Sequence, residues 1–171
     1  MPRPSSAPPL QMTDMAPGVT NVGYWDEAAK DWDCVHDTFA TDEKGVIAKN
    51  LAQHCRNDQQ VIDFGCGGGR YLRYLSSRCG LVLGIDISPA LLAIARRDVV
   101  QRYKIHNCEL RCADLGAPSA CELALPTCSL GVCTNVQLCG AAHLRTRANI
   151  LSLMATGMHQ CAYLSGAAHA N

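Results

Sequence analysis

Two acidic residues that end short apolar runs, and a cluster of glycines after the first, are the features of this 171-residue sequence best suited to chemistry. The segment from Asp63 to Gly69 reads DFGCGGG, and Asp86 ends the run LVLGID. Glycines permit positive φ and let a backbone approach a ligand with no Cβ between them. A helix beginning directly after such a loop offers free backbone amides. The pattern predicts a ligand site at this loop.

The spacing of the glycines separates two cofactor classes. A dinucleotide fingerprint requires G-x-G-x-x-G or a terminal alanine. Counting from Gly65 places Arg70 at the last position, and counting from Gly67 places Leu72 there. Neither register fits, which disfavours a nucleotide-binding oxidoreductase-like domain.

A succession of strands and helices must position this loop. Short apolar runs bounded by turn residues predict strands, and apolar residues three and four apart predict helices. The predicted strands cover residues 61–65, 81–87, 108–113, 129–134 and 161–165, and the predicted helices cover residues 26–39, 42–54, 70–79, 88–97 and 144–158. This alternation predicts an α/β fold, a doubly wound Rossmann-like and mostly parallel sheet of about five strands. In such a sheet the ligand binds at the carboxyl ends of the strands, next to the loop after the first.

Three predicted helix starts carry specific signals. Asp26 and Glu27 suit the positive N-terminal end of the first helix. Asp42 is the expected cap of the second. The helix after the second strand has the clearest start, with Ser88 as N-cap and Pro89 at the first helical position.

The segment Asp63-Phe64-Gly65-Cys66-Gly67, followed by two more glycines, resembles the first motif of the class I S-adenosylmethionine-dependent methyltransferases. The resemblance implies that Asp63 faces the amino group of the cofactor's methionine moiety. It also implies that Gly65 and Gly67 line the carboxypropyl chain, and that Cys66 contributes backbone rather than thiol.

Two further motifs follow in the order of that family. Gly84-Ile85-Asp86-Ile87-Ser88 resembles the end of the family's second strand, which implies that Asp86 holds both ribose hydroxyls and that Ile87 packs on the adenine ring. The segment CADLG resembles the family's third motif, which implies that Asp114 is the adenine-flanking acidic residue and that its carboxylate accepts a hydrogen bond from the exocyclic amine.

The end of the fourth strand, residues 133–137 with sequence CTNVQ, is where the family's cofactor meets the acceptor. No Asn/Asp-Pro-Pro-Tyr element is present there, which argues against methylation of base amines or glutamine amides. Asn135 and Val136 resemble the end of the fourth strand in the small-molecule branch of the family. The resemblance implies that Asn135 is one of the cofactor-binding residues. The N-terminal stretch YWDEAAKDWD is also similar to that branch, in which a helix bearing Tyr24 and Trp25 closes over the cofactor.

No catalytic residue is assigned from the sequence. A sulfonium methyl is already activated, so holding the acceptor close and aligned supplies much of the rate, and a dedicated base is optional. For a hydroxyl acceptor the candidate bases are His36, His143 and Asp114.

The expected domain organisation is a Pro/Ser-rich disordered leader at residues 1–20 and one methyltransferase domain at residues 21–171. Only six residues follow Ser165, so the family's terminal hairpin does not fit. The exposed edge strand that results is expected either to be covered by a partner chain, such as a second copy, or to mark a shortened product or fragment.

Composition and charge limit the partners, the cellular compartment and the metal content that the sequence predicts. The formal net charge is zero and the pI is about 7.0, so no overall field attracts nucleic acid or an anionic membrane. Eleven cysteines are an odd number, no secretory signal precedes them, and no spacing forms a zinc site. The sequence therefore predicts a reduced, cytoplasmic protein with no resident metal.

Three functions remain from these observations. The first is transfer of a methyl group from S-adenosylmethionine to a small-molecule acceptor by in-line displacement. The second is a catalytically inactive or partner-dependent module that binds the same cofactor. The third is the disfavoured oxidoreductase-like domain.

Overall fold

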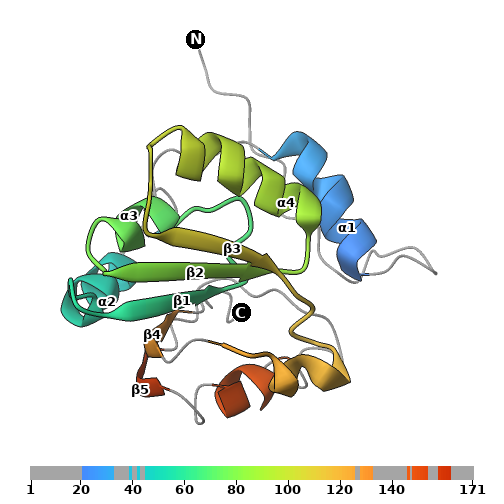
Figure 1. The fold of residues 1–171 in the computed structure, drawn as a ribbon. Helices are drawn as coiled ribbons and strands as arrows, with labels where there is room; N and C mark the ends of the chain where they lie inside the picture. Colours follow the sequence, from blue (N-terminus) through green and yellow to red (C-terminus); the bar gives the residue numbers. More distant parts are fainter. Residues whose placement is uncertain are drawn as a thin grey trace, which may run out of the picture.

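The computed structural model shows a parallel sheet between two layers of helices (Figure 1). The structure describes residues 21–32, 39, 42, 45–125, 128–132, 146, 148–153 and 158–162. The expected leader at residues 1–20 lies outside the described residues, so the division of the chain at residue 20 stays a prediction.

Five strands form one sheet in the order β3-β2-β1-β4-β5, and all neighbouring strands are parallel. The strands are β1 (Gln60–Phe64), β2 (Leu81–Asp86), β3 (Cys108–Cys112), β4 (Cys128–Val132) and β5 (Met158–Ala162). β1 lies in the middle, and the chain winds outward from it in both directions. The predicted doubly wound, Rossmann-like α/β fold is confirmed, with a topological switch point between β1 and β4.

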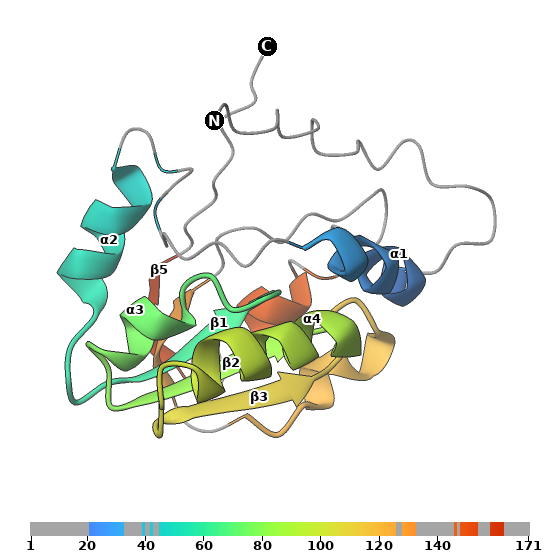
Figure 2. The same cartoon turned by 90° about the horizontal axis from the view of Figure 1, so that it is seen from above.

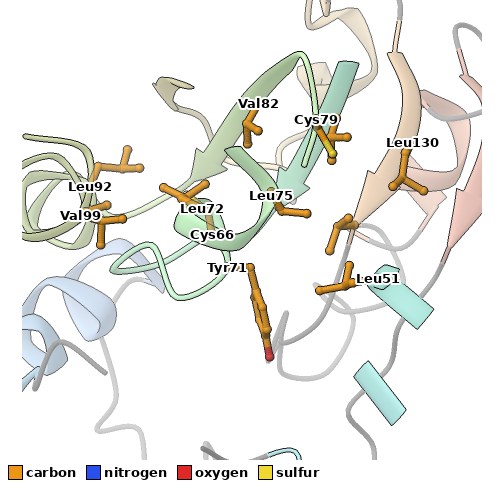
Figure 3. Close-up of a cluster of buried hydrophobic side chains, with 13 residues drawn as sticks. Leu51, Cys66, Tyr71, Leu72, Leu75, Cys79, Val82, Leu92, Val99 and Leu130 are labelled. Carbon is orange, nitrogen blue, oxygen red and sulfur yellow. The ribbon is translucent and has the colours of Figure 1, made fainter. Parts of the chain in front are cut away.

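The side chains of β1 alternate between two hydrophobic clusters on opposite faces of the sheet. Val61 packs with Leu72 and the other helix residues of one cluster, while Ile62 packs with Ile150 of the second cluster. The first cluster includes Leu51, Cys66, Tyr71, Leu75, Cys79, Val82, Leu92, Val99 and Leu130 (Figure 3). Because both faces are covered, the central strands β1, β2 and β4 are buried along most of their length, as is usual in parallel sheets, whereas β3 is partly exposed.

The N-terminal helix starts and ends earlier than its periodicity indicates. α1 covers Asn21–Ala28, a 3-10 turn η2 covers Ala29–Asp31, and Trp32 follows in an extended conformation. The prediction of one helix over residues 26–39 was therefore wrong in both bounds. Asp26 does not serve the start of its own helix, because its carboxylate accepts hydrogen bonds from the first turn of another.

The second helix, α2, covers Val46–His54 and so begins four residues later than predicted. Gly45 precedes it with φ +63°, a left-handed conformation that interrupts the helix. Asp42 nevertheless serves the first turn, because its carboxylate accepts a 2.8 Å hydrogen bond from the amide of Ala48.

The remaining helices on this side of the sheet are α3 (Leu72–Ser76) and α4 (Pro89–Ile94), which continues as a π-helical stretch, η3 (Ala95–Gln101). The predicted cap is confirmed, because Ser88 Oγ accepts a 3.1 Å hydrogen bond from the amide of Leu91. Along the described part of the chain, no helix combines the length and apolarity needed to cross a bilayer.

The C-terminal elements differ from the sequence prediction by a few residues. β4 begins at Cys128, one residue early, and a helical segment at 148–153 lies within the predicted helix over residues 144–158. Met158 belongs to β5 rather than to that helix, because it pairs with Cys128 across the sheet. The predicted fifth strand therefore started three residues too late. β5 ends the described sheet, and its coverage by a partner chain stays a prediction.

A glycine in the middle of β2 allows the loop after β1 to pack against the sheet. A Cβ at Gly84 would lie 2.9 Å from Cys66 Sγ and 2.9 Å from Leu110 Cδ2. We therefore expect Gly84→Ala to lower the free energy of unfolding by about 2 kcal/mol, measured by urea denaturation. Adding Cys66→Ala removes one of the two overlaps, so the double variant should lose less than the sum of the single losses. Strict additivity would contradict this packing.

Candidate functional site

The loop after β1 takes a conformation that requires glycine. Gly65, Gly67 and Gly69 have φ values of +73°, +51° and +89°. At Gly69 a Cβ would also lie 3.1 Å from the Cβ of Ala95. The loop is fastened to β2, because the amide of Gly65 donates a 2.8 Å hydrogen bond to the carbonyl of Ile85. The glycines therefore serve a tight turn that brings the loop against the end of β2.

Asp86, the last residue of β2, holds this loop and the start of α4 together. One carboxylate oxygen accepts a 2.8 Å hydrogen bond from the amide of Gly67, and the other accepts a 3.0 Å bond from the amide of Ser88. Burial raises the pKa of Asp86, while these backbone amides oppose the rise. An ionised carboxylate has about four lone-pair sites, and these two hydrogen bonds use two of them. The carboxylate can therefore accept hydrogen bonds from a ligand without releasing the loop.

Asp63, in β1, is a buried carboxylate that no described residue pairs by hydrogen bond. It is 1% exposed, and neither oxygen has a hydrogen-bond partner among the described residues. Burial raises its pKa to about 7, and the negative charge of Asp86 adds to the rise. An ionised carboxylate in such a place is unfavourable unless it is paired. The site therefore favours a ligand group that brings positive charge and donors to Asp63.

The thiol of Cys66 faces the core, close to Gly84. Burial raises the pKa of this thiol well above its ordinary value, so it is not a nucleophile. The backbone of Cys66 is engaged inside the loop, since its amide donates to Ile85 and its carbonyl accepts from Gly69. Its predicted backbone role toward a ligand stays a prediction.

The other predicted residues are only partly brought to this site. Ile87 directly follows Asp86 and is half-buried. Asp114 lies two residues beyond β3 and is exposed, with one oxygen accepting a 2.8 Å hydrogen bond from the amide of Gly116. Its roles at the adenine and as a base stay predictions. Asn135, His36 and His143 lie outside the described residues.

Two residues of the N-terminal segment for which the sequence analysis gave no role at the site, Asp26 in α1 and Trp32 after η2, contact the elements around Asp86. The indole of Trp32 lies against Gly67 and Gly68, so closely that a Cβ at Gly68 would overlap its Nε1. The carboxylate of Asp26 binds Ser88, whose amide binds Asp86. The sequence analysis noted that the N-terminal stretch resembles the small-molecule branch, but it assigned the cofactor contact to Tyr24 and Trp25 rather than to Asp26 and Trp32.

Tyr24 and Trp25 form an edge-to-face pair in α1 with ring centroids 5.1 Å apart. Their predicted closure over a cofactor stays a prediction. Within the described segments, no three His, Cys, Asp or Glu side chains gather as a metal ion would require.

Comparison with known proteins adds independent findings. A profile of the family described as a methyltransferase domain matches residues 61–156, more than half of the chain. A dTDP-3-amino-3,6-dideoxy-alpha-D-glucopyranose N,N-dimethyltransferase of Streptomyces fradiae is 33% identical over 99 residues, which cover 54% of this chain and 37% of that protein. A ribosomal protein L11 methyltransferase of Paraburkholderia phymatum is 39% identical over 75 residues, which cover 42% of this chain and 22% of that protein.

Among solved structures, a DhpI–SAH complex superposes with a TM-score of 0.62 and 17% identity, covering 84% of this chain and 66% of that one. At this identity the likeness concerns the fold. This chain spans less than two fifths of the length of the two curated relatives.

Proposed function

This chain belongs to the class I S-adenosylmethionine-dependent methyltransferases, and from that premise we propose that it binds S-adenosylmethionine and transfers its methyl group to a small-molecule acceptor. The observation that carries the proposal is the buried, unpartnered carboxylate of Asp63 beside the glycine loop. It lies in the strand next to the one that ends in Asp86.

The residues present fit this cofactor. Its methionine moiety carries an ammonium group, which supplies the charge and the donors that Asp63 lacks. Its ribose offers two hydroxyls, and the Asp86 carboxylate has lone-pair sites left after the two backbone amides are counted. Ile87 directly follows Asp86 and is half-buried, and we assign to it the packing against the adenine ring.

When bound, the cofactor supplies a methyl group already activated by positive sulfur. The chain must then bind the cofactor, align an acceptor with its methyl group and exclude water. The described residues do the first of these tasks through the glycine loop, Asp63 and Asp86. No side chain is assigned to the removal of a proton.

Similarity to an amino-sugar N,N-dimethyltransferase supports a small-molecule acceptor bearing an amine. Similarity to a ribosomal protein L11 methyltransferase supports a competing acceptor class, a protein. Transfer of labelled methyl groups to amino sugars linked to nucleotides, compared with transfer to isolated ribosomal proteins, distinguishes the two. Label on neither acceptor, by a chain that binds the cofactor, would favour the catalytically inactive module.

Binding is tested first on the wild-type chain. We expect S-adenosylhomocysteine to bind with a dissociation constant in about the micromolar range by calorimetry, which corresponds to about 8 kcal/mol. A large excess of NAD should not displace it. A chain that is folded by circular dichroism, yet binds NAD and not S-adenosylhomocysteine, would contradict the proposal.

A further inference from the structure

The N-terminal helix is joined to the start of α4 by a pair of hydrogen bonds across 62 and 64 residues of sequence. One oxygen of Asp26 accepts a 2.6 Å hydrogen bond from Ser88 Oγ and a 3.2 Å bond from the amide of Ala90. Ser88 is fully buried, and its Oγ also accepts from the amide of Leu91. The Ser88 hydroxyl is thus held on both sides, which fixes α1 against α4 (Figure 2).

Six residues after Asp26, the same segment makes a second contact, on the glycine loop. The 3-10 turn η2 ends the helix, and Trp32 leaves it with φ −71° and ψ 107°. This turn places the indole on Gly67 and Gly68, where Cζ2 would lie 3.8 Å from a Cβ at Gly67. At Gly67 a Cβ would make an ordinary contact with the ring, whereas at Gly68 only glycine leaves room for it.

The two contacts lie on either side of Asp86. Its carboxylate binds the amide of Ser88, which Asp26 also holds, and the amide of Gly67, on which Trp32 lies. The segment from Asp26 to Trp32 therefore spans the two elements that the Asp86 carboxylate connects. A ligand that lies along the glycine loop must either contact the indole or displace it.

We propose that Asp26 is a positioning residue for the cofactor: by holding α1 to Ser88, it sets the indole of Trp32 as a wall beside the glycine loop. The proposal rests on the proposed function for the identity of the ligand. Because Trp32 contacts Gly67, the glycine placed along the carboxypropyl chain, the wall acts on the amino-acid end of the cofactor. Asp86 keeps its own hydrogen bonds to the amides of Gly67 and Ser88 when Asp26 is removed, so the adenosine end, which we assign to Asp86, should depend less on the wall.

This difference allows a test with two ligands. S-adenosylhomocysteine carries the amino-acid chain, and 5′-methylthioadenosine lacks it. We expect Asp26→Ala to weaken S-adenosylhomocysteine roughly tenfold, since hydrogen bonds to a charged group are lost, and to leave 5′-methylthioadenosine nearly unchanged. Asp26→Asn retains an acceptor for Ser88 and should recover part of the loss. A role in stability alone would weaken both ligands equally.

The matched control is Glu27→Ala, which removes the same charge from the next residue of α1. Glu27 is exposed and pairs with Lys30 at 2.6 Å, so its removal should change neither ligand's affinity. A second control is Asp26→Ala combined with Trp32→Ala. If Asp26 acts through the indole, the double variant should bind S-adenosylhomocysteine no more weakly than Trp32→Ala alone.

Tryptophan fluorescence, measured without ligand, tests the positioning role of Asp26 separately from the proposed cofactor binding. The chain has two tryptophans, so Trp25→Phe leaves Trp32 as the sole emitter. In that background Asp26→Ala should make Trp32 emission redder and more accessible to acrylamide, whereas Glu27→Ala should not. Unchanged emission, or an unchanged ratio of the two affinities, would overturn the positioning role. If the wild type binds neither ligand while its Trp32 emission depends on Asp26, the proposed function fails and the joint between α1 and α4 stands.

Discussion

S-adenosylhomocysteine should bind the Asp86→Ala variant at least about a hundredfold more weakly than it binds the wild type. The expected ribose contacts are two hydrogen bonds to a charged acceptor, each worth about 1.5 kcal/mol or more, and a hundredfold loss corresponds to about 2.8 kcal/mol. The substitution also frees the amides of Gly67 and Ser88, which loosens the loop along which the cofactor lies. Both effects weaken binding.

Calorimetry measures this loss, and circular dichroism checks that the variant is folded. Asp42→Ala is the matched control, because Asp42 also accepts a backbone amide, from Ala48, but at the start of α2. Its loss should lower stability by about 1 kcal/mol and leave the affinity unchanged. Equal binding by wild type and the folded Asp86→Ala variant would remove Asp86 from the site.

Asp63→Asn should stabilise the unliganded chain at pH 8 and weaken cofactor binding. The pKa of Asp63 lies at about 7 in the folded chain against an ordinary value of 3.8, a difference that corresponds to about 4 kcal/mol. An asparagine has the same shape and no charge to bury. After a penalty of about 1 to 2 kcal/mol for a buried amide without partners, we expect a net gain of about 2 to 3 kcal/mol.

The raised pKa of Asp63 also determines how the difference in stability between the two chains should change with pH. Between pH 4 and 7 the folded chain keeps a proton on Asp63 that the unfolded chain has released, because the folded pKa is raised to about 7. The wild type therefore loses stability as the pH rises through this range, and the loss is complete above about pH 7. The advantage of Asp63→Asn should grow from pH 4 to pH 7 and then level off.

Urea denaturation of both chains at several pH values measures the difference in unfolding free energy. An advantage that does not change with pH would show that Asp63 has the same pKa in the folded and unfolded chains, which would contradict the raised pKa. Binding should respond in the opposite direction, because the cofactor's ammonium group pairs with the ionised carboxylate. Wild-type affinity for S-adenosylhomocysteine should rise as the pH approaches 7, and the asparagine variant should show little of this rise. These two results together would show that Asp63 lowers the stability of the unliganded chain and strengthens cofactor binding.

Much of the fold could be predicted because its signals are local. The apolar runs that end in Asp63 and Asp86 are short, bounded by turn residues and apolar on both faces, which identifies buried parallel strands. The cap at Ser88 is also local, since the accepting oxygen and the amide of Leu91 are three residues apart. The predicted ends of strands were less accurate where pairing with a neighbouring strand decides them. Met158, for example, belongs to β5 because it pairs with Cys128 of β4.

The sequence by itself determined the order of strands and helices, the glycine loop and the two carboxylates at the adjoining strands, because each depends on neighbours within a few residues. Only the tertiary structure decided where Asp26 and Trp32 lie and what charge Asp63 carries. Asp26 meets Ser88 across 62 residues, and helical periodicity contains no information about which surfaces meet. The raised pKa of Asp63 follows from burial and from the nearby charge of Asp86, which exist only once the sheet is covered on both faces.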